Sequence, residues 1–510
     1  MTSTVAFTAD SEVSAASRWR QYLVLALATY LVFKVLIHPF ILSPVRHIPG
    51  PWYCRISRLP LQYATYQRRR TAFVTGLLDT YGPIVVIAPD QVHTTDDTAM
   101  KTIYDKTSIK TSFYASMGSW KGVTSTLGFL TYPEAAPSRN NLVQCFQNRN
   151  LAALIDNIES HVDDFIRILD QRAQANEAVD GVKNRLLANV NEEAARDFIR
   201  RFHAFSTWNA MKSFIPGADL LVRLVGSQRW KRLRADCNDL DITAREALER
   251  WQTADADADR HDKDVLSMLQ SMNTSKASAV PPEDVSAYMV EMLAAGSSTT
   301  SHTAAFASFL LTRHPDAQRR LREELAAAFP LQDEMDIRKT VDLPFLDGVL
   351  RETMRMYPMI PGPLERYTGS DMTMSGYNVC KGVIASNAAF NQGRLPHVFP
   401  EPDSWKPERW IEATEEMKLN WIPFGHGSRA CPGSNLAMTE LKYMIGKIFR
   451  KFQAVIPPGH EDDVLEMADV FAAGSNWEAP TQPSGFQLTG ADTKSAAAWA
   501  KDDQLPGLIL

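Results

Sequence analysis

The longest apolar run of the chain lies near its start, from Tyr22 to Leu42, and only Lys34, His38 and Pro39 interrupt it. As a helix this run would measure about 31 Å, which is the thickness of a bilayer core. Lys34 is compatible with such a span because a long side chain can extend its charge to the membrane interface. The alternatives are an amphipathic surface helix and a cleaved signal peptide, which would need a small-residue cleavage site that we do not find. We therefore expect one transmembrane helix.

After residue 48 the hydrophobic pattern is mainly that of helices. Apolar residues recur at steps of three and four from Leu151 to Leu169, which predicts an amphipathic helix packed on a core. Start and stop signals predict a long helix from about Pro281 to Arg313 and a shorter helix from Pro344 to Tyr357. A further helical stretch runs from Asn435 to Phe449. The long helix is expected to cross a whole domain.

Strand signals are few and short. Turn residues enclose an apolar strand within residues 82–89, and residues 372–379 are a second strand candidate. No internal repeat is visible, and no Gly/Ser-rich or Pro-rich linker divides the rest of the chain. The sequence thus predicts a mainly α protein with a small β part. We expect a tail and membrane anchor at 1–47, one large domain at 48–490 and a C-terminal tail at 491–510.

Composition narrows the class of protein. The chain has 510 residues, 45% hydrophobic and 22% charged, a balance typical of globular proteins. A net charge of -5 gives no basic field, so we expect no nucleic-acid partner. The aspartate-rich stretch Thr253–Asp264 lacks the Gly and Glu of a calcium loop and is expected to be a surface loop. The cysteines are odd in number and widely spaced, which favours a reducing compartment: Cys54, Cys145, Cys237, Cys380 and Cys431.

The most specific motif is the loop from Phe424 to Gly433, where three glycines surround one cysteine just before a helical stretch. Backbone N–H groups and the positive end of the following helix stabilise negative charge on sulfur, so we expect a lowered thiol pKa at Cys431. Gly425 permits a tight turn around the sulfur, and Gly433 permits a flat ring to approach the backbone. Arg429 adds a permanent cation. The alternative is a buried, inert cysteine in a Gly-rich turn.

In this loop the chain resembles the cytochrome P450 family, whose haem-binding signature Phe-x-x-Gly-x-Arg-x-Cys-x-Gly is matched at every fixed position. The resemblance runs from about Ile48 to about Gln487 and implies the fold of that family behind a single N-terminal transmembrane helix. It also implies haem b with an axial cysteine thiolate, and a set of residues around that cofactor. These are Cys431 as the iron ligand, with Arg429, Phe424, Gly425 and Gly433.

Two further matches occur in the order of the family. Glu352-Thr-Met-Arg355 sets a carboxylate and a guanidinium three residues apart on one helix face, where they can pair. Arg409 lies in Pro-Glu-Arg-Trp and is implied to complete a structural triad with them behind the haem. Alone, such a pair would be an ordinary solvated ion pair. Arg366 matches a position that the family uses for a haem propionate.

The long helix contains Ala-Gly-Ser-Ser-Thr-Thr at residues 295–300, which resembles the oxygen-activating segment of the family. A glycine within a helix costs roughly 1 kcal/mol and therefore has a reason, here room for dioxygen. The resemblance implies that Thr299, beside Thr300, helps to relay protons. The alternative is a polar helix face whose hydroxyls bond to backbone carbonyls. The chain departs from the family at Ser298, where a carboxyl group is usual and a hydroxyl cannot replace it as an acid.

Two departures concern the haem propionates. Many relatives carry His-x-x-x-Arg in the helix after Tyr132-Pro133, whereas this chain has Arg139 one residue out of register, as a possible substitute. A His-Arg pair of the family is here Gly393-Arg394.

The resemblance implies a monooxygenase that inserts one oxygen atom of O2 into a lipophilic small molecule, in secondary metabolism, and the proportions look fungal. No flavin-binding Gly-x-Gly-x-x-Gly unit is present, so a separate NADPH-cytochrome P450 reductase is implied as partner. Four cations just past the loop are either its docking face or ordinary solvated charges: Lys442, Lys447, Arg450 and Lys451. Two alternatives stay open: a haem-thiolate isomerase, dehydratase or ring-forming enzyme without external electrons, and a non-catalytic haem or lipid-binding protein.

Charge around the apolar run predicts the location. Arg46, His47, Arg55 and Arg58 follow the run, which places the large domain in the cytosol and the anchor in the endoplasmic reticulum membrane. By family analogy the substrate pocket is lined by five mostly apolar segments, which favours a terpenoid or polyketide. They are residues 113–130, 208–221, 292–295, 359–364 and 472–477.

Overall fold

The computed structural model describes residues 9–120, 123–174, 217–253, 264–272, 285–331, 334–456 and 486–490, with short pieces within 178–212 and 459–475. The C-terminal tail 491–510 and nearly all of the aspartate-rich stretch, residues 254–263, lie outside the described residues. The expectations for those two segments therefore stay predictions.

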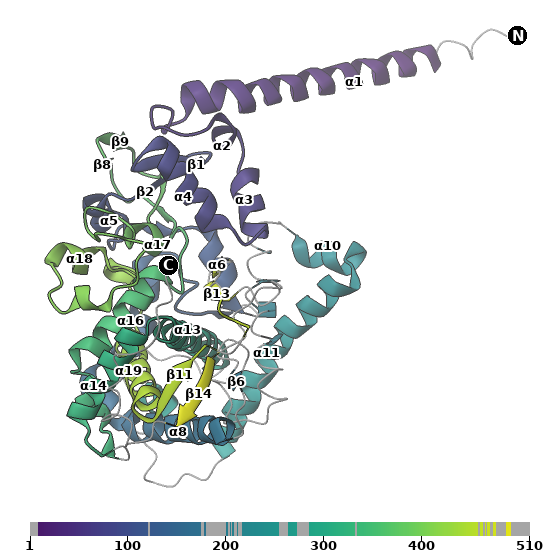
Figure 1. Cartoon of the computed structure of the whole chain (residues 1–510). Coiled ribbons are helices and arrows are strands. Elements are labelled where there is room, and N and C mark those ends of the chain that lie inside the picture. Colours follow the sequence, from purple (N-terminus) through teal and green to yellow (C-terminus); the bar gives the residue numbers. More distant parts are fainter. Residues whose placement is uncertain are drawn as a thin grey trace, which may run out of the picture.

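The N-terminal helix stands away from the body of the protein (Figure 1). Helix α1 (Ala9–Val32) continues into the π-helical segment η1 (Phe33–Leu42), which contains Pro39. A proline removes one helical N–H and clashes with the preceding turn, which accounts for the change of helix type. Residues Trp19–Leu42 form a helix of 24 residues that is long and apolar enough to cross a membrane, with a mean hydropathy of 2.0. Only 6% of its most apolar 18-residue window is buried inside the protein.

Contacts between this helix and the large domain begin before residue 48. Ser43 donates to Asp90 at 2.7 Å, and Val45 is only 1% exposed. Arg55 donates to the carbonyl oxygens of Val45 and Arg46 at 3.2 Å, and also to that of Ile48. The first residues after the apolar run are therefore part of the folded body.

A five-stranded sheet lies beside the N-terminal helices, above the helical body in Figure 1. Its order is β1 (Ile84–Ala88), β2 (Gln91–Thr94), β10 (Ile384–Ser386), β7 (Arg366–Tyr367) and β3 (Ile109–Lys110), with one parallel pair, β10 and β2. Both faces of β1 are buried, because Ile84 and Val86 pack in one apolar cluster and Val85 and Ile87 in another. This double burial explains why the strand reads as a continuous apolar run.

The second strand candidate, residues 372–379, is a hairpin and not one strand. Strand β8 (Met372–Met374) pairs with β9 (Tyr377–Val379), and Ser375 and Gly376 both have positive φ angles, 47° and 84°. Two such residues in succession fit a tight two-residue hairpin turn.

The helical body is built on the helices that the hydrophobic pattern predicts. They are α8 (Asn148–Gln174), α13 (Val285–Arg313), α16 (Pro344–Met356) and α19 (Ser434–Lys451), joined by α14 (Pro315–Ala328). One large apolar cluster draws residues from all five of them. Helix α13 lies in the middle of the body (Figure 1) and contacts both α16 and α19. The predicted mainly α fold with a small β part is confirmed.

The remaining elements are shorter or peripheral. The helices are α2 (Trp52–Ile56), α3 (Leu59–Tyr66), α4 (Arg70–Tyr81), α5 (Asp97–Ile103), α6 (Ser112–Gly118), α7 (Tyr132–Cys145), α10 (Ala218–Val225), α11 (Gln228–Thr253), α12 (Val265–Met272), α15 (Ile337–Thr340), α17 (Ala389–Gln392), η4 (Pro407–Trp410), α18 (Glu415–Asn420) and η5 (Gly427–Arg429). The strands are β4 (Ser119–Trp120), β5 (Val123–Thr124), β6 (Ala178–Val179), β11 (Phe452–Val455), β12 (Met467–Asp469), β13 (Ala473–Ser475) and β14 (Phe486–Gly490).

Candidate functional site

The loop before α19 turns tightly around Cys431. The N–H of Cys431 donates to the carbonyl oxygen of Phe424 at 2.8 Å, which closes the loop. Gly425 and Gly427 have positive φ angles of 73° and 67°. A Cβ on Gly427 would lie 2.3 Å from the carbonyl oxygen of Tyr104, so no larger residue fits there without movement. The glycines of the motif therefore shape the loop, as the spacing predicts.

Cys431 differs from the buried cysteines of the chain. Cys54, Cys145 and Cys237 are buried, and burial raises their thiol pKa values to about 12, 11 and 12, so they stay protonated. Cys431 and Cys380 are accessible, and all five thiols are free. Within the described residues no group of three or more His, Cys, Asp or Glu could hold a metal ion.

The expected lowering of the Cys431 pKa is wrong for the chain without a metal. The side chain of Cys431 has exposed surface, but protein surrounds most of the sulfur. The resulting loss of solvation raises the pKa of the thiol. The N–H of Gly433 and the charge of Arg139 act in the expected direction, but burial outweighs them, and Glu291 adds to the rise. A coordinated metal ion deprotonates a thiol outright, so the thiolate depends on the metal more than on the helix end.

Four cations from four elements gather beside the cysteine loop. Lys110 on β3 and Arg366 on β7 are direct partners across the sheet edge. Arg139 on α7 donates to the carbonyl oxygen of Ala430 at 2.8 Å, which brings it to the loop that carries Arg429. We call Lys110, Arg139, Arg366 and Arg429 the cation cluster. Like charges this close repel one another, so the cluster is costly unless an anion joins it.

The electrostatics of the cation cluster are those of an anion site. Burial, and then Arg366 and Arg139, lower the pKa of Arg429 to about 10. Burial lowers the pKa of Lys110 well below its usual range, and the other cluster members lower it further. Nη2 of Arg429 is buried without a hydrogen-bond partner. The two carboxylates of a haem fit this donor set, because ionised oxygens are what such groups bind most strongly.

Sequence reasoning identified three members of the cation cluster and missed Lys110. Lys110 donates to the carbonyl oxygen of Leu127 at 2.8 Å and is only 5% exposed. Its signal in the sequence is weak, because a lysine in a two-residue strand looks like any solvated charge. Only its pairing with Arg366 across the sheet reveals its position.

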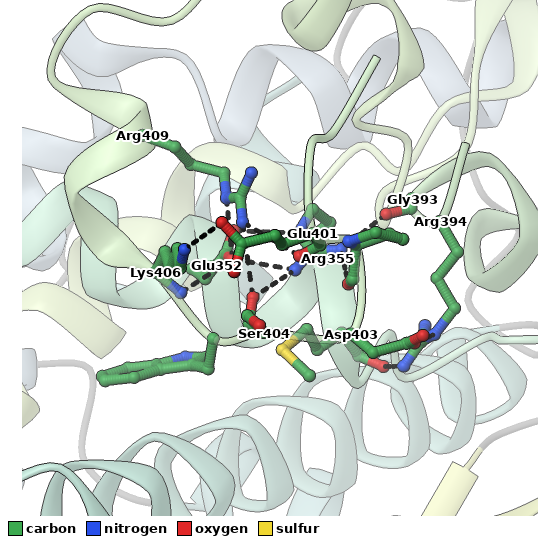
Figure 2. A network of polar contacts seen from close by, with 12 residues as sticks. Glu352, Arg355, Gly393, Arg394, Glu401, Asp403, Ser404, Lys406 and Arg409 are labelled. Atoms are coloured by element: carbon green, nitrogen blue, oxygen red, sulfur yellow. Dashed lines mark hydrogen bonds and ion pairs between the residues drawn. The ribbon is translucent and has the colours of Figure 1, made fainter. Parts of the chain in front are cut away.

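A second arginine-rich site lies at the end of α16 (Figure 2). Arg355 holds Glu352 through two bonds, from Nε at 2.9 Å and from Nη2 at 2.8 Å, and both side chains are 0% exposed. Arg409 donates from Nε to Oε1 of Glu352 at 2.9 Å. Trp410 and the backbone N–H of Lys406 complete the shell of the carboxylate, at 2.9 and 3.0 Å. We call Glu352, Arg355 and Arg409 the triad.

The Gly393-Arg394 departure lies at the triad and not at the cation cluster. The carbonyl oxygen of Gly393 accepts from Arg355 at 2.6 Å. A Cβ on Gly393 would lie 2.8 Å from the carbonyl oxygen of Arg355, which explains the glycine. Arg394 pairs with Asp403 at 3.3 Å and donates to the carbonyl oxygen of Met356. Arg394 is therefore committed to the packing around the triad.

Helix α13 carries Ser298, Thr299 and Thr300 at its middle. Thr299 donates to the carbonyl oxygen of Ala295 at 2.6 Å, the back-bonding that the polar-face alternative predicts. A Cβ on Gly296 would meet no atom within 4 Å, so this turn of the helix faces open space. Thr300 is buried, 7% exposed.

Sequence reasoning missed Glu291, a lone carboxylate in an apolar stretch of α13. Its two oxygens accept from the N–H groups of Leu127 and Thr126 at 2.7 and 3.1 Å, so it holds the loop before α7 against the helix. Burial raises its pKa, and Lys110 and the loop N–H groups act in the opposite direction.

The basic residues of α19 do not form a free docking face. Lys442 pairs with Asp347 at 2.9 Å, Lys447 with Asp163 at 2.9 Å, and Lys451 with Asp170 at 3.2 Å. Arg450 donates to the carbonyl oxygens of Phe329 and Pro330 at 2.9 Å. These charges join α19 to its neighbours, which neither the docking reading nor the solvated reading predicts.

Part of the expected pocket lining cannot be placed. Residues 121–122, 209–211, 213–216, 472 and 476–477 lie outside the described residues. Among those described, Leu220 and Leu221 are 62% and 50% exposed, so that end of the 208–221 segment lies at the surface.

Comparison with known proteins gives a consistent family. A family model described as Cytochrome P450 matches residues 49–474. Cytochrome P450 monooxygenase atr2 of Stereocaulon alpinum is 26% identical over 467 residues, 86% of this chain and 90% of that protein. Cytochrome P450 monooxygenase ABA2 of Pyricularia oryzae is 25% identical, with 80% and 84% covered. Cytochrome P450 3A31 of Mesocricetus auratus is 35% identical over a shorter stretch of 198 residues, 38% of this chain and 39% of that protein.

Proposed function

The chain belongs to the cytochrome P450 family, and from this premise we propose that it is a haem-thiolate monooxygenase that inserts one oxygen atom into a lipophilic small molecule. One observation carries the proposal. An accessible thiol, Cys431, lies beside four cations, and a buried guanidinium nitrogen of Arg429 among them has no partner. A site that bound a neutral ligand, or that served only the fold, would not need an uncompensated positive charge.

In the proposed role Cys431 is the protein ligand to the haem iron, and the cation cluster binds the two haem carboxylates. Phe424, Gly425 and Gly433 shape the loop, and a Cβ on Gly433 would have only the Cys431 sulfur nearby, at 4.0 Å. The bound haem supplies O2 activation, which thiolate donation to the iron favours. The N–H of Gly433, which lowers the thiol pKa, stabilises charge on the sulfur.

Helix α13 would provide space for oxygen and would move protons. Gly296 leaves space at the helix surface, and Thr299, flanked by Ser298 and Thr300, has lone pairs that can accept a proton donor's hydrogen bond while its own hydrogen is held by Ala295. The triad would have a structural role, because its ion pairs fix the end of α16 and the chain around Arg409.

The proposal includes partners and a location. Electrons would come from a separate NADPH-cytochrome P450 reductase, and Trp19–Leu42 would anchor the protein in the endoplasmic reticulum membrane with the large domain in the cytosol. The fungal origin of relatives such as those in Stereocaulon alpinum and Pyricularia oryzae supports a role in fungal secondary metabolism.

The first test replaces the proposed ligand. Cys431→Ser should abolish the thiolate-type carbon monoxide difference spectrum of the reduced protein, because a hydroxyl is not deprotonated at neutral pH. Cys380→Ser changes the other accessible cysteine and should leave the spectrum intact. An unchanged spectrum in Cys431→Ser would eliminate Cys431 as the ligand.

The second test separates an oxygenase from an electron-independent haem-thiolate enzyme. Membranes holding this protein and a reductase should consume NADPH and O2 with a panel of lipophilic precursors. Thr299→Ala should raise peroxide release per NADPH consumed, since a positioned proton-transfer group is worth roughly 10² to 10⁴ in rate. Product formation without NADPH, unaffected by Thr299→Ala, would favour the isomerase alternative instead.

The third test concerns the anchor. Removal of the apolar run should release much of the protein from membranes while the haem spectrum persists. The cut is best made after Leu42 and not after residue 47, because Ser43 and Val45 contact the folded body. Full-length protein that is already soluble would refute the anchor.

A further inference from the structure

Helix α13 carries a row of hydroxyl groups, and several of them bond to the helix itself. Thr299, Ser301 and Thr303 donate to the carbonyl oxygens four residues earlier at 2.6, 2.6 and 2.8 Å. Such bonds occupy each hydroxyl hydrogen within its own turn. Ser298 differs, because its Oγ lies 3.4 Å from Nδ1 of His302, one turn further along. The residue that departs from the family thus faces a titratable ring.

A second contact shows which ring nitrogen carries the hydrogen. Nδ1 of His302 lies 2.7 Å from the carbonyl oxygen of Ser298. A carbonyl oxygen can only accept, so Nδ1 is protonated and Nε2 of the neutral ring keeps a lone pair. The Ser298 hydroxyl faces the same N–H and must accept there, which leaves its own hydrogen to point elsewhere. In this pair His302 is therefore the hydrogen-bond donor and Ser298 the acceptor.

The surroundings hold this ring in place and keep it neutral. Burial lowers the pKa of His302, and the bond to the Ser298 carbonyl acts in the opposite direction. The ring packs edge-on against Phe306, with centroids 6.4 Å apart, and Phe306 is 0% exposed and contacts Tyr357. A neutral ring can give a hydrogen at one nitrogen and take one at the other, which a carboxylate of low pKa does less well.

We propose that His302 supplies protons to Ser298, at the position where the resemblance to the family implies a carboxyl group. The inference rests on the oxygenase function proposed above. Each proton that leaves Ser298 Oγ is replaced by the hydrogen on Nδ1 of His302, which lies 3.4 Å away. The ring recovers a proton at Nε2 from water and returns to its starting tautomer by exchange with water, so no charge accumulates. His302 is a positioning residue in this scheme, since it acts through Ser298.

Glu291 is the other candidate source on the same helix. Both of its oxygens are engaged by the N–H groups of Thr126 and Leu127, so the carboxylate already has a structural task. It lies seven residues before Ser298, two turns away, whereas His302 contacts Ser298 directly. The geometry therefore favours His302.

The decisive variant is His302→Asn in the full-length protein with a reductase. Asparagine keeps an N–H donor near the place of Nδ1 and so keeps the bond to the Ser298 carbonyl, but it cannot pass a proton on. We expect at least about a 10-fold rise in peroxide per product formed, with an unchanged carbon monoxide spectrum. His314→Asn is the matched control, since Nδ1 of His314 lies at the same 2.7 Å from the carbonyl oxygen of Leu310, and it should change nothing.

Rescue separates proton supply from packing. Ser298→Asp restores an acid, so the double variant Ser298→Asp with His302→Asn should recover most of the coupling. Full coupling in His302→Asn alone would overturn the proposal. So would a loss of coupling that Ser298→Asp does not repair, or a loss in Glu291→Gln that His302→Asn does not share.

A measurement without turnover tests the same pair. Carbon-labelled histidine in the reduced, carbon monoxide-bound protein should show, besides the Nδ1–H ring expected of His314, an Nδ1–H ring that titrates below the ordinary range, disappears in His302→Asn and shifts in Ser298→Ala. An Nε2–H tautomer, or no response to Ser298→Ala, would contradict the proposal. Absence of the thiolate-type spectrum in the wild type would refute the proposed function, and the tautomer could still be read from the haem-free chain.

Discussion

Arginines gather at two sites within the fold. Their charges are compensated by a carboxylate at one site and not at the other. In the triad, Glu352 accepts five hydrogen bonds, two from Arg355 and one each from Arg409, Trp410 and the N–H of Lys406. In the cation cluster, burial and the neighbouring cations lower the pKa of Arg429 and of Lys110, and Nη2 of Arg429 has no hydrogen-bond partner. Glu291, a carboxylate that acts on Lys110, has its oxygens on backbone N–H groups.

The difference separates structural cations from ligand-binding ones. A charge buried for the sake of the fold must be compensated by the chain itself, because an unpaired buried charge costs several kcal/mol. A charge kept for a ligand can stay uncompensated until the ligand arrives. Arg394 illustrates the rule: it comes from a family motif for propionates, yet it pairs with Asp403 and belongs to the triad side.

The largest expected effect is at the triad. Glu352→Gln leaves two buried guanidinium groups without their anion and should destabilise the fold by about 3–5 kcal/mol, with or without haem. Unfolding in urea and the yield of haem-bound protein measure this. Glu408→Gln is the matched control, because Glu408 is 49% exposed and only 3.5 Å from Arg320, so its loss should cost less than about 1 kcal/mol. If the haem-free Glu352→Gln chain were as stable as the wild type, the distinction between structural and ligand-binding cations would be refuted.

The next-largest effect is at the cation cluster, where a substitution should weaken haem binding but should not destabilise the haem-free chain. Arg429→Gln should weaken haem binding by about 10- to 100-fold, the worth of one hydrogen bond to a charged group. It should leave the haem-free chain as stable or more stable, because it relieves repulsion. Haem transfer to a scavenger protein and thermal unfolding of the haem-free chain measure the two quantities. Arg319→Gln at the surface should change neither, and a haem-free chain destabilised as in Glu352→Gln would contradict the comparison.

The smallest expected effect is a pH dependence of stability that arises at the cation cluster. The folded-state pKa of Lys110 is lowered from its usual 10.5, so between these two values the unfolded chain binds more protons. Stability of the haem-free protein should therefore rise as pH rises through this window, by at most about 1.4 kcal/mol per pH unit for one group. Lys110→Met should remove that rise. Bound haem should also flatten it, because carboxylates restore the pKa; an equal slope with and without haem would count against propionate binding there.

The hydrophobic pattern determined the helices that frame the site. The period of α8, the start and stop signals of α13, the proline at the start of α16 and the apolar run before residue 43 are local properties, so they could be read without the fold. The glycine spacing around Cys431 is equally local, and the structure shows the positive φ angles that it implies.

Long-range placement was beyond the sequence. A two-residue strand decides that Lys110 lies opposite Arg366, and no local signal marks so short a strand. For the chain without a metal, the direction of the Cys431 pKa was predicted wrongly because burial, which depends on the whole fold, outweighs the helix end. The Ser298 and His302 residues stand four apart on a helix, so their contact could have been foreseen, but the tautomer that gives it a direction could not.

The sequence by itself therefore determined which residues carry chemistry, since a thiol, a carboxylate or a glycine has its properties wherever it stands. Only the tertiary structure decided which charges are compensated. Arg355, Arg394 and Arg429 are identical groups, and the first is held by Glu352, the second by Asp403, while Nη2 of the third has no partner. Compensation is a property of pairs that lie far apart in the chain, and Coulomb interactions depend on distance in space, which only folding sets.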